Sequence, residues 1–355
     1  MNRCTKCIMP ENYPRIEFDE EGTCNFCNNP QEVEYLGPEA LKRKILSSDS
    51  DREYDCVVGF SGGRDSSYLL YYLSSVLDLN VVALSIDNGY LPSETKNNIE
   101  NIANRLNVDL VEKKYPYLED CFTKHLKAWL HNPSPAMLAT LCVGCRLGLA
   151  KGKYEFLKDR KIPYYVTGAT PFEGNMYKTN LLRFPRKSNN KISLILGYLR
   201  EIARNPKWAN KPQCFLTQMQ EFLAYYGRRY DKKLQSKGTQ KITPFKEYIK
   251  WDEDKIVDTL ENQLDWQRNE STGSTWRGDC EVALLKQYLY IETLGYNEKD
   301  DSLSDLIRDG QISRQEALRR LNEEQFISED VIRDIVEKNG IDYTHFSRVV
   351  NNISE

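Results

Sequence analysis

The chain has 355 residues, enough for a large hydrophobic core and for more than one lobe. Its net charge of −3 gives no overall electrostatic attraction to nucleic acid, and no apolar run is long enough to span a bilayer. Because the first residues also lack an apolar signal region, we expect a cytoplasmic protein without a membrane span. Ten cysteines in such a protein favour metal binding or catalysis over disulfide bonds.

Two Cys-x-x-Cys pairs open the chain. Cys4 and Cys7 form the first pair, Cys24 and Cys27 form the second, and sixteen residues separate the two. Two thiolate pairs at this spacing are typical of a closed, four-coordinate structural zinc site. We therefore predict that residues 1–50 are a zinc-ribbon-like module and a linker. Free surface thiols and an iron–sulfur cluster on the same four ligands are the alternatives.

The sequence around residue 60 predicts a strand, a glycine-rich turn and a helix. An apolar stretch over 56–60 precedes the turn, and an apolar-rich helix follows over 68–76. Adjacent glycines let the backbone turn sharply, and the next amides lie at a helix N-terminus, which attracts anions. We predict that this turn binds a phosphate or pyrophosphate; a turn without a ligand is the alternative. The turn reads Ser61-Gly62-Gly63-Arg64-Asp65-Ser66-Ser67.

This strand, turn and helix resemble the PP-loop of the ATP pyrophosphatase superfamily. Members of that superfamily split ATP between the α and β phosphates and place AMP on a substrate oxygen. The resemblance implies ATP and Mg²⁺ as cofactors, ATP binding by Ser61–Ser67, and catalytic roles for Arg64 and Asp65. Arg64 stands where the superfamily usually has lysine, so the charge is kept with a different donor geometry. Asp65 is alternatively a simple charge at a helix N-terminus.

Apolar strands alternate with helices after this loop, which predicts a doubly wound α/β domain with a parallel sheet over residues 51–180. We expect strands at 80–87, 108–112 and 163–168. Ligands of such sheets bind beyond the carboxyl ends of the strands. The resemblance implies that Ser85 and Asp87 contact the adenine, that Gly168 closes over the nucleotide, and that Glu173 helps to hold Mg²⁺. Loop solvation or helix capping is the alternative for the two acidic residues.

A second group of cysteines comprises Cys142, Cys145 and the distant Cys280. In several PP-loop enzymes that thiolate tRNA, a similar pattern holds a 4Fe–4S cluster with one open iron, which implies a catalytic and metal-binding role here. A redox pair at Cys142 and Cys145, a second zinc site with an unidentified fourth ligand, and plain packing are the alternatives.

The rest of the chain departs from the α/β pattern. Residues 181–270 are predicted to form a helical, basic insert that contributes to substrate binding. Its two basic stretches, 183–191 and 228–233, suit RNA, a sugar nucleotide or a solvated surface. Residues 271–355 are predicted to be helical, with helices at 281–293, 303–309, 314–323 and 328–338.

Three stretches extend the resemblance over most of the chain. They are Cys4-x-x-Cys7-Ile8-Met9-Pro10 with the later Phe18-Asp19-Glu20-Glu21-Gly22-x-Cys24, the PP-loop preceded by Tyr54-Asp55-Cys56, and the tail Ile307 to Ala317. Together they resemble the N-acetyl sugar amidotransferases of surface-polysaccharide and flagellin glycan synthesis. The family converts an acetamido group on a sugar into an acetamidino group.

The resemblance implies an N-acetyl sugar nucleotide or glycan-lipid substrate. It also implies ammonia from separate glutaminase and channel subunits, with AMP and pyrophosphate as products. The alternative is a sulfur transferase that acts on tRNA or a small molecule through the 4Fe–4S cluster, and only this alternative calls for nucleic acid. A third hypothesis is an ATP-binding regulator without catalysis, which the intact loop disfavours. A homodimer stays open.

Overall fold

The computed structural model describes residues 2–30, 33–47, 52–115, 117–173, 176–185, 190–208, 212–226, 228–269, 274–324 and 326–354. The predicted basic stretch 183–191 lies partly outside these ranges, since 186–189 are not described. In the described part of the chain, no helix is both long and apolar enough to cross a membrane.

A five-stranded parallel sheet confirms the predicted doubly wound α/β fold. Its strand order is β3-β2-β1-β4-β5, so the order reverses between β1 and β4. Ligands bind at such a reversal, beyond the carboxyl ends of the strands. The register sets Val58 of β1 against Ala83 of β2 and Val166 of β4. The strands are β1 (Cys56–Gly59), β2 (Val81–Asp87), β3 (Asp109–Lys114), β4 (Tyr164–Thr167) and β5 (Gln240–Ile242).

Helices cover both faces of this sheet, because alternate strand residues point to opposite sides. Val58 and Ala83 pack with apolar residues of α3, α4 and α12. Val57 and Val82 face the other way, toward α6 and α10. The helices of this body are α2 (Pro38–Leu46), α3 (Arg64–Tyr71) with its π-helical continuation η1 (Tyr72–Val76), α4 (Ser93–Arg105), α6 (Val143–Leu157), α10 (Arg229–Gln235), α11 (Pro244–Glu247) and α12 (Glu253–Leu264).

Strand β5 was not predicted. It contains only three residues, and Gln240 and Lys241 are exposed. The sequence therefore has no apolar run at this position that would predict a strand. Within the predicted segment 181–270, β5 joins the sheet and α12 packs against α3 and α4.

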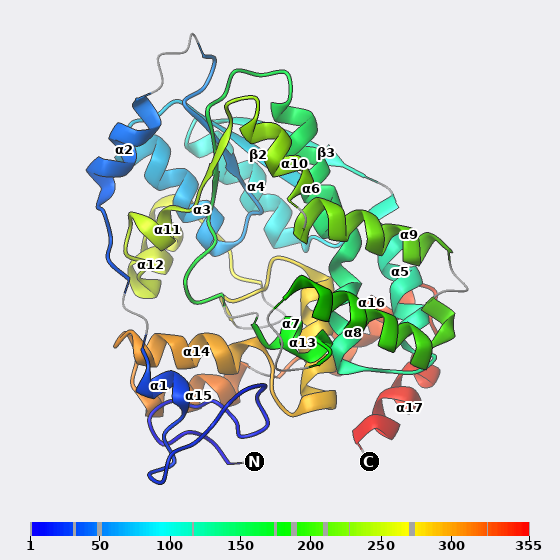
Figure 1. The fold of residues 1–355 in the computed structure, drawn as a ribbon. Helices are drawn as coiled ribbons and strands as arrows, with labels where there is room; N and C mark the ends of the chain where they lie inside the picture. Colours follow the sequence, from blue (N-terminus) through cyan, green and yellow to red (C-terminus); the bar gives the residue numbers. More distant parts are fainter. Residues whose placement is uncertain are drawn as a thin grey trace.

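A second apolar core lies in the helical half of the molecule and includes the N-terminal module. Figure 1 shows this module beneath α14 and α15, while α13 rises beside them. The predicted C-terminal helices are confirmed, although α14 begins earlier than expected because Asn297 and Asp300 form a capping box. The remaining helices are α1 (Asn25–Asn28), α5 (Tyr117–Trp129), η2 (Pro135–Cys142), α7 (Met176–Leu182), α8 (Lys191–Arg204), η3 (Pro206–Trp208), α9 (Pro212–Glu221), η4 (Phe222–Tyr226), α13 (Glu281–Leu294), α14 (Glu298–Arg308), α15 (Arg314–Glu324), α16 (Glu329–Lys338) and α17 (Tyr343–Ser354).

Replacement of Leu69 by alanine tests the packing of α3 on the sheet. Leu69 is fully buried, so Leu69→Ala should lower the free energy of unfolding by about 2–5 kcal/mol through lost burial and a residual cavity. Leu46→Ala on α2 is the matched control, since Leu46 is 44% exposed and its loss should change stability by about 0.5 kcal/mol or less. Urea unfolding measures both, and equal losses would contradict the packing described.

Candidate functional site

The glycine-rich loop joins the end of β1 to the start of α3. Gly62 has φ +74°, and a Cβ there would lie 2.7 Å from the carbonyl oxygen of Thr95. A Cβ on Gly63 would lie 2.9 Å from a carboxylate oxygen of Asp279. Gly62 therefore needs glycine, whereas a side chain at Gly63 would require Asp279 to move. The loop is braced internally, because the Ser61 amide donates a 3.1 Å hydrogen bond to the Ser66 hydroxyl.

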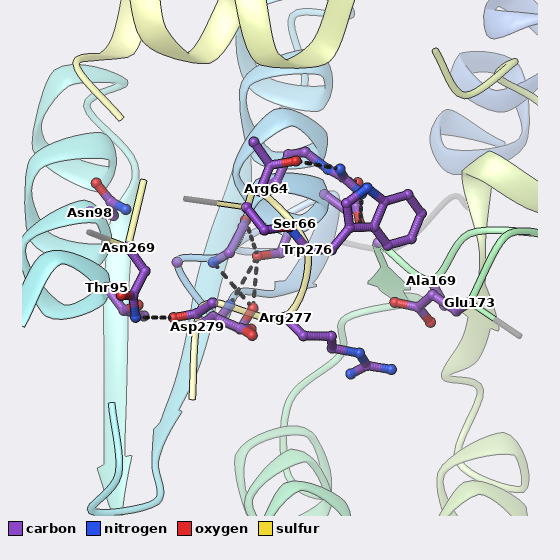
Figure 2. Close-up of a pocket in the computed structure, with 18 of the residues that line it drawn as sticks. Arg64, Ser66, Thr95, Asn98, Ala169, Glu173, Asn269, Trp276, Arg277 and Asp279 are labelled. Carbon is purple, nitrogen blue, oxygen red and sulfur yellow. Dashed lines mark hydrogen bonds and ion pairs between the residues drawn. The ribbon is translucent and has the colours of Figure 1, made fainter. Parts of the chain in front are cut away.

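A cavity of about 320 Å³ opens beside this loop at the point where the strand order reverses. Figure 2 shows Thr95 and Asn98 of α4 on one side of it and Ala169 and Glu173 on the opposite side. Its volume falls in the range of small-molecule sites. Segments far apart in sequence line it: the loop, the end of β4, parts of 266–269 and 274–279, and the start of α14.

The structure brings most of the predicted nucleotide-binding residues to this cavity. The predicted residues that line the cavity are Ser61, Gly62, Gly63, Arg64, Asp65, Ser66, Gly168 and Glu173.

Three of the predicted nucleotide-binding residues are placed differently. Ser67 is buried in α3 behind the loop. Ser85 and Asp87 of β2 are absent from the described cavity lining. Asp87 instead accepts a 2.7 Å hydrogen bond from the Gly89 amide and pairs with Lys114 at 3.4 Å, because it closes the turn after β2. The adenine contacts expected of Ser85 and Asp87 remain a prediction.

Buried hydroxyls near the loop fit a polar ligand. The side-chain oxygens of Ser67, Thr167 and Thr170 are buried and have no hydrogen-bond partner among the described residues. Such groups are usually satisfied by protein, water or ligand. Thr167 lines the cavity directly.

Arg64 is buried between two indole rings. Its guanidinium carbon lies 4.8 Å from the Trp251 ring centroid and 4.3 Å from that of Trp276, which are cation–π distances. It donates hydrogen bonds to Glu253 at 2.7 Å and to Asp65 at 3.1 Å. These carboxylates offset its charge, so in this structure Arg64 fixes the shape of the loop.

The acids around Arg64 have different electrostatic surroundings. Burial raises the pKa of Glu253, but the charge of Arg64 and a hydrogen bond from Arg320 outweigh burial, so the net pKa lies below the usual value. Trp276 also donates a 2.6 Å hydrogen bond to Glu253. Burial raises the pKa of Glu173, and Arg277 only partly opposes it. Glu253 is therefore the more fully ionised of the two acids.

A charged cluster borders the cavity at the start of α14. Glu298 pairs with Lys178 and lies 3.7 Å from the Arg277 guanidinium. Burial lowers the pKa of Lys178 to about 8 despite the opposing effect of Glu298. Although burial raises the pKa of Glu298, Lys178 and Arg277 hold it far below its usual range. The cluster thus holds an ionised acid beside an amine that titrates near neutral pH.

The structure brings the second cysteine group together. The Asn88 side-chain amide lies 3.7 Å from the Cys145 sulfur and 3.4 Å from the Cys280 sulfur. Lys286 donates a 3.1 Å hydrogen bond to the Cys142 sulfur. Burial raises the pKa of Cys145 to about 11 and that of Cys280 to about 12. The neighbouring cysteines raise both pKa values further. Burial acts to raise the pKa of Cys142, but Lys286 and Arg146 together outweigh burial, so the pKa is lowered.

The four N-terminal cysteines form a compact sulfur cluster. Their sulfur atoms all lie within 4.8 Å of one another. Cys7 and Cys24 are 3.7 Å apart, and Cys4 and Cys27 are 4.0 Å apart. A tetrahedral metal with bonds of about 2.3 Å to sulfur needs sulfur separations of about 3.8 Å, so this donor set fits a metal ion. Arg308 donates to Cys7 at 3.4 Å, which suits an anionic thiolate centre.

Helix α14 joins the N-terminal module to the cavity. Its Asp300 pairs with Arg3, its Asp301 accepts a 2.9 Å hydrogen bond from Tyr13, and its Ser304 accepts one from the Ile8 amide. The same helix contributes to the cavity lining through Glu298, Lys299 and Ser302.

Sequence reasoning missed the partners that the C-terminal half supplies to the loop. Trp266 donates a 3.0 Å hydrogen bond to the Gly62 carbonyl oxygen, and Trp251 donates one of 2.8 Å to Asp65. Asp279 lies against Gly63. The stretch Trp276-Arg277-Gly278-Asp279 carries a detectable signal, since one tryptophan, two charged residues and a glycine stand together there just before Cys280.

Comparisons with known proteins match parts of this chain. Residues 270–355 match the family described as LPS biosynthesis protein WbpG-like, C-terminal domain. Uncharacterized protein MJ1599 of Methanocaldococcus jannaschii is 28% identical over 171 residues, which are 47% of this chain and 58% of that protein. The chain thus spans under two thirds of that relative's length. The C-terminal family match includes Arg277, Asp279 and Glu298 of the cavity and the tail Ile307–Ala317.

One similar solved structure is the U34-tRNA thiolase NcsA from Methanococcus maripaludis with its 4Fe–4S cluster. The two chains are 14% identical with a TM-score of 0.34, and the alignment covers 91% of this chain and 89% of NcsA. A likeness this distant carries no argument about function.

Replacement of Glu253 by glutamine tests the buried pair with Arg64. Glu253→Gln should lower the free energy of unfolding at pH 7 by about 3–5 kcal/mol, because it leaves a buried cation short of one carboxylate. The folded-state pKa of Glu253 is depressed below 4.5. Its contribution is therefore complete above that pH and is lost as the pH falls through the folded-state pKa, so the two stabilities should converge in acid. Urea unfolding followed by tryptophan fluorescence measures this.

Glu261→Gln on the same helix is the matched control. Glu261 pairs with Arg268 at the surface, so its replacement should change stability by about 1 kcal/mol or less. A loss as large as that of Glu253→Gln, or a Glu253→Gln effect that persists in acid, would contradict the buried ion pair.

Proposed function

We propose that this chain is an ATP-dependent adenylating enzyme of the PP-loop superfamily that acts in the cytoplasm on the acetamido group of an N-acetyl sugar. One observation carries the proposal: the Ser61–Ser66 loop borders a cavity at the strand-order reversal, and the Thr167 hydroxyl that lines this cavity has no hydrogen-bond partner among the described residues. The C-terminal match to an LPS biosynthesis family supports a sugar substrate.

The proposed reaction has two steps. The acetamido oxygen attacks the α phosphorus of ATP, and pyrophosphate leaves. Ammonia then attacks the activated carbon, loses a proton and displaces AMP, which leaves an acetamidino group. Adenylation is needed because amide resonance makes the unactivated carbon a poor electrophile. The nitrogen comes, in this proposal, from separate glutaminase and channel subunits.

The residues of the cavity suit these steps. Amides at the start of α3 and the Ser61 and Ser66 hydroxyls bind the phosphates. Asp65 and Glu173, which both line the cavity, would hold Mg²⁺, which supplies charge neutralisation for the departing pyrophosphate. Arg64 keeps the loop in shape through Glu253 and the two indoles. Lys178 pairs with Glu298 and so keeps that carboxylate in place at the edge of the cavity.

The N-terminal cysteines would hold Zn²⁺ in a structural role. All four ligand positions are supplied by sulfur, so the site leaves no place for a substrate. Its contacts with α14 then hold the first turn of that helix against the cavity.

Replacement of Asp65 by asparagine tests the adenylation proposal. With ATP, Mg²⁺, ammonium and an N-acetyl sugar nucleotide, the unmodified protein should release pyrophosphate and AMP. Asp65→Asn should slow this release by about 10²–10³-fold, because the carboxylate proposed to hold Mg²⁺ against the phosphates is lost. Asp258→Asn, at an exposed position of α12, should be unaffected. Unchanged pyrophosphate release by folded Asp65→Asn would contradict the proposal.

A second candidate function is sulfur transfer to tRNA or a small molecule. The observation that favours it is that the side-chain amide of Asn88 contacts the sulfurs of both Cys145 and Cys280. Lys286 donates a hydrogen bond to the sulfur of Cys142. These three thiols would hold a 4Fe–4S cluster, which would supply an open iron for sulfur binding. Under this candidate, nucleic acid becomes a partner.

Anaerobic purification with iron and zinc analysis separates the two candidates. Sulfur transfer predicts about four iron atoms per chain and visible absorbance, both lost in Cys280→Ser. Amidine formation predicts about one zinc and no stoichiometric iron, with zinc lost in Cys24→Ser. Cys121→Ser is the matched control, because Cys121 contacts Thr217 and lies in neither cysteine group. Iron that survives Cys280→Ser would exclude the three-cysteine cluster.

A further inference from the structure

Helix α8 turns an apolar stripe toward the solvent. Ile192, Ile195, Leu196 and Leu199 recur at helical spacing, and their exposed fractions run from 42% to 62%. The opposite side of α8 is buried, and it includes Leu194. A surface helix usually carries polar residues on its outer side. Helix α8 is instead apolar on both sides, so its outer side is suited to contact something other than water.

The next helix repeats this arrangement. Phe215, Leu216 and Met219 of α9 and Leu223 of η4 are also exposed and recur at helical spacing. Both α8 and α9 contact η3, the short helix between them. Figure 1 shows α8 and α9 on the side of the molecule away from α2 and α12. We call these two rows of side chains the α8 stripe and the α9 stripe.

The charged residues of the segment that carries the stripes are almost all positive. Residues 176–229 hold eleven lysines and arginines but two acids, Glu201 and Glu221, in a chain whose net charge is −3. Both acids are 2% exposed; Glu201 pairs with Arg200 and, at 3.7 Å, with Arg204, and Glu221 pairs with Arg146. Within the described residues of this segment, the exposed charges are therefore cations, and they include the 66%-exposed Arg204.

These charges decide between partners. A second copy of the chain would bring the same cations face to face across a two-fold axis, which is unfavourable. Protein interfaces are enriched in aromatic residues, methionine and arginine, whereas leucine is under-represented among the residues that contribute most to binding. The two stripes hold one aromatic residue, Phe215, and are otherwise aliphatic or methionine. Aliphatic stripes beside lysine and arginine are typical of helices that lie in a membrane interface.

We propose that the face formed by α8, η3 and α9 binds an anionic membrane surface. The two stripes enter the boundary between headgroups and acyl chains, while Arg200, Arg204 and Lys207 contact lipid phosphates. The protein lies on the membrane and does not cross it. This inference does not depend on the reaction catalysed in the cavity, since none of the stripe residues lines that cavity.

Vesicle co-sedimentation of the full-length protein tests this proposal. The protein should bind vesicles of equal parts phosphatidylcholine and phosphatidylglycerol, and binding should weaken with phosphatidylcholine alone and with added salt. The double change Leu196→Glu and Leu199→Glu should weaken binding at least about tenfold, because it places charge at the interface. Arg204→Gln should weaken binding about fivefold, and only to the anionic vesicles.

Leu46→Glu is the matched control, since Leu46 is equally exposed on α2 but lies far from the stripes. It should bind vesicles like the unmodified protein. Circular dichroism and thermal unfolding of each variant verify folding, because all substituted side chains are exposed or half-exposed.

Three results would overturn the proposal. The first is equal binding by the stripe variant and the control. The second is absence of vesicle binding together with a dimer, seen by analytical ultracentrifugation, that Leu199→Glu dissociates. The third is absence of vesicle binding together with capture of an acidic protein that depends on Leu199 and Arg204.

Discussion

The buried guanidinium of Arg64 is the interaction on which the rest of the site depends. It lies in the glycine-rich loop, but its partners Glu253, Trp251 and Trp276 come from the second half of the chain. An uncompensated charge in this place would destabilise the fold by several kcal/mol. The loop therefore takes its binding-competent shape only when the C-terminal segments have packed against it. This explains why the cavity is lined by residues that are far apart in sequence.

The same coupling appears at the start of α14. Glu298 organises Arg277 and Lys178 beside the cavity, while the next turn contacts the N-terminal module through Asp300 and Asp301. Burial raises the pKa of Asp301 to about 7, although the hydrogen bond from Tyr13 opposes this. Elements that look separable in sequence are thus joined by buried polar contacts, and a substitution in one of them will be felt in the others.

The sequence predicts those parts of the molecule that local patterns determine. Apolar runs, adjacent glycines and cysteine spacing indicate the parallel sheet, the loop and the four-sulfur cluster, and the structure contains all three. Long-range partners have no local pattern, so Glu253 as the partner of Arg64 and Asn88 as the neighbour of two cysteines were missed. Strand β5 was missed for a related reason: it is three residues long and is ordered by pairing with β4. Asp87 shows that a polar side chain at the end of a strand can also stabilise the turn that follows, since it accepts a hydrogen bond from the Gly89 amide.

The long separation between the N-terminal module and α14 has a consequence for biosynthesis. Arg3 and Asp300 are 297 residues apart, so at about 5–20 residues per second the ribosome needs roughly 15–60 s to supply the second partner after the first. During that interval Arg308, which donates to the Cys7 sulfur, and Asp301, which accepts the hydrogen bond from Tyr13, have not yet been synthesised. Early metal capture would protect these thiols from oxidation while translation continues, and it would let the module fold before its docking helix exists.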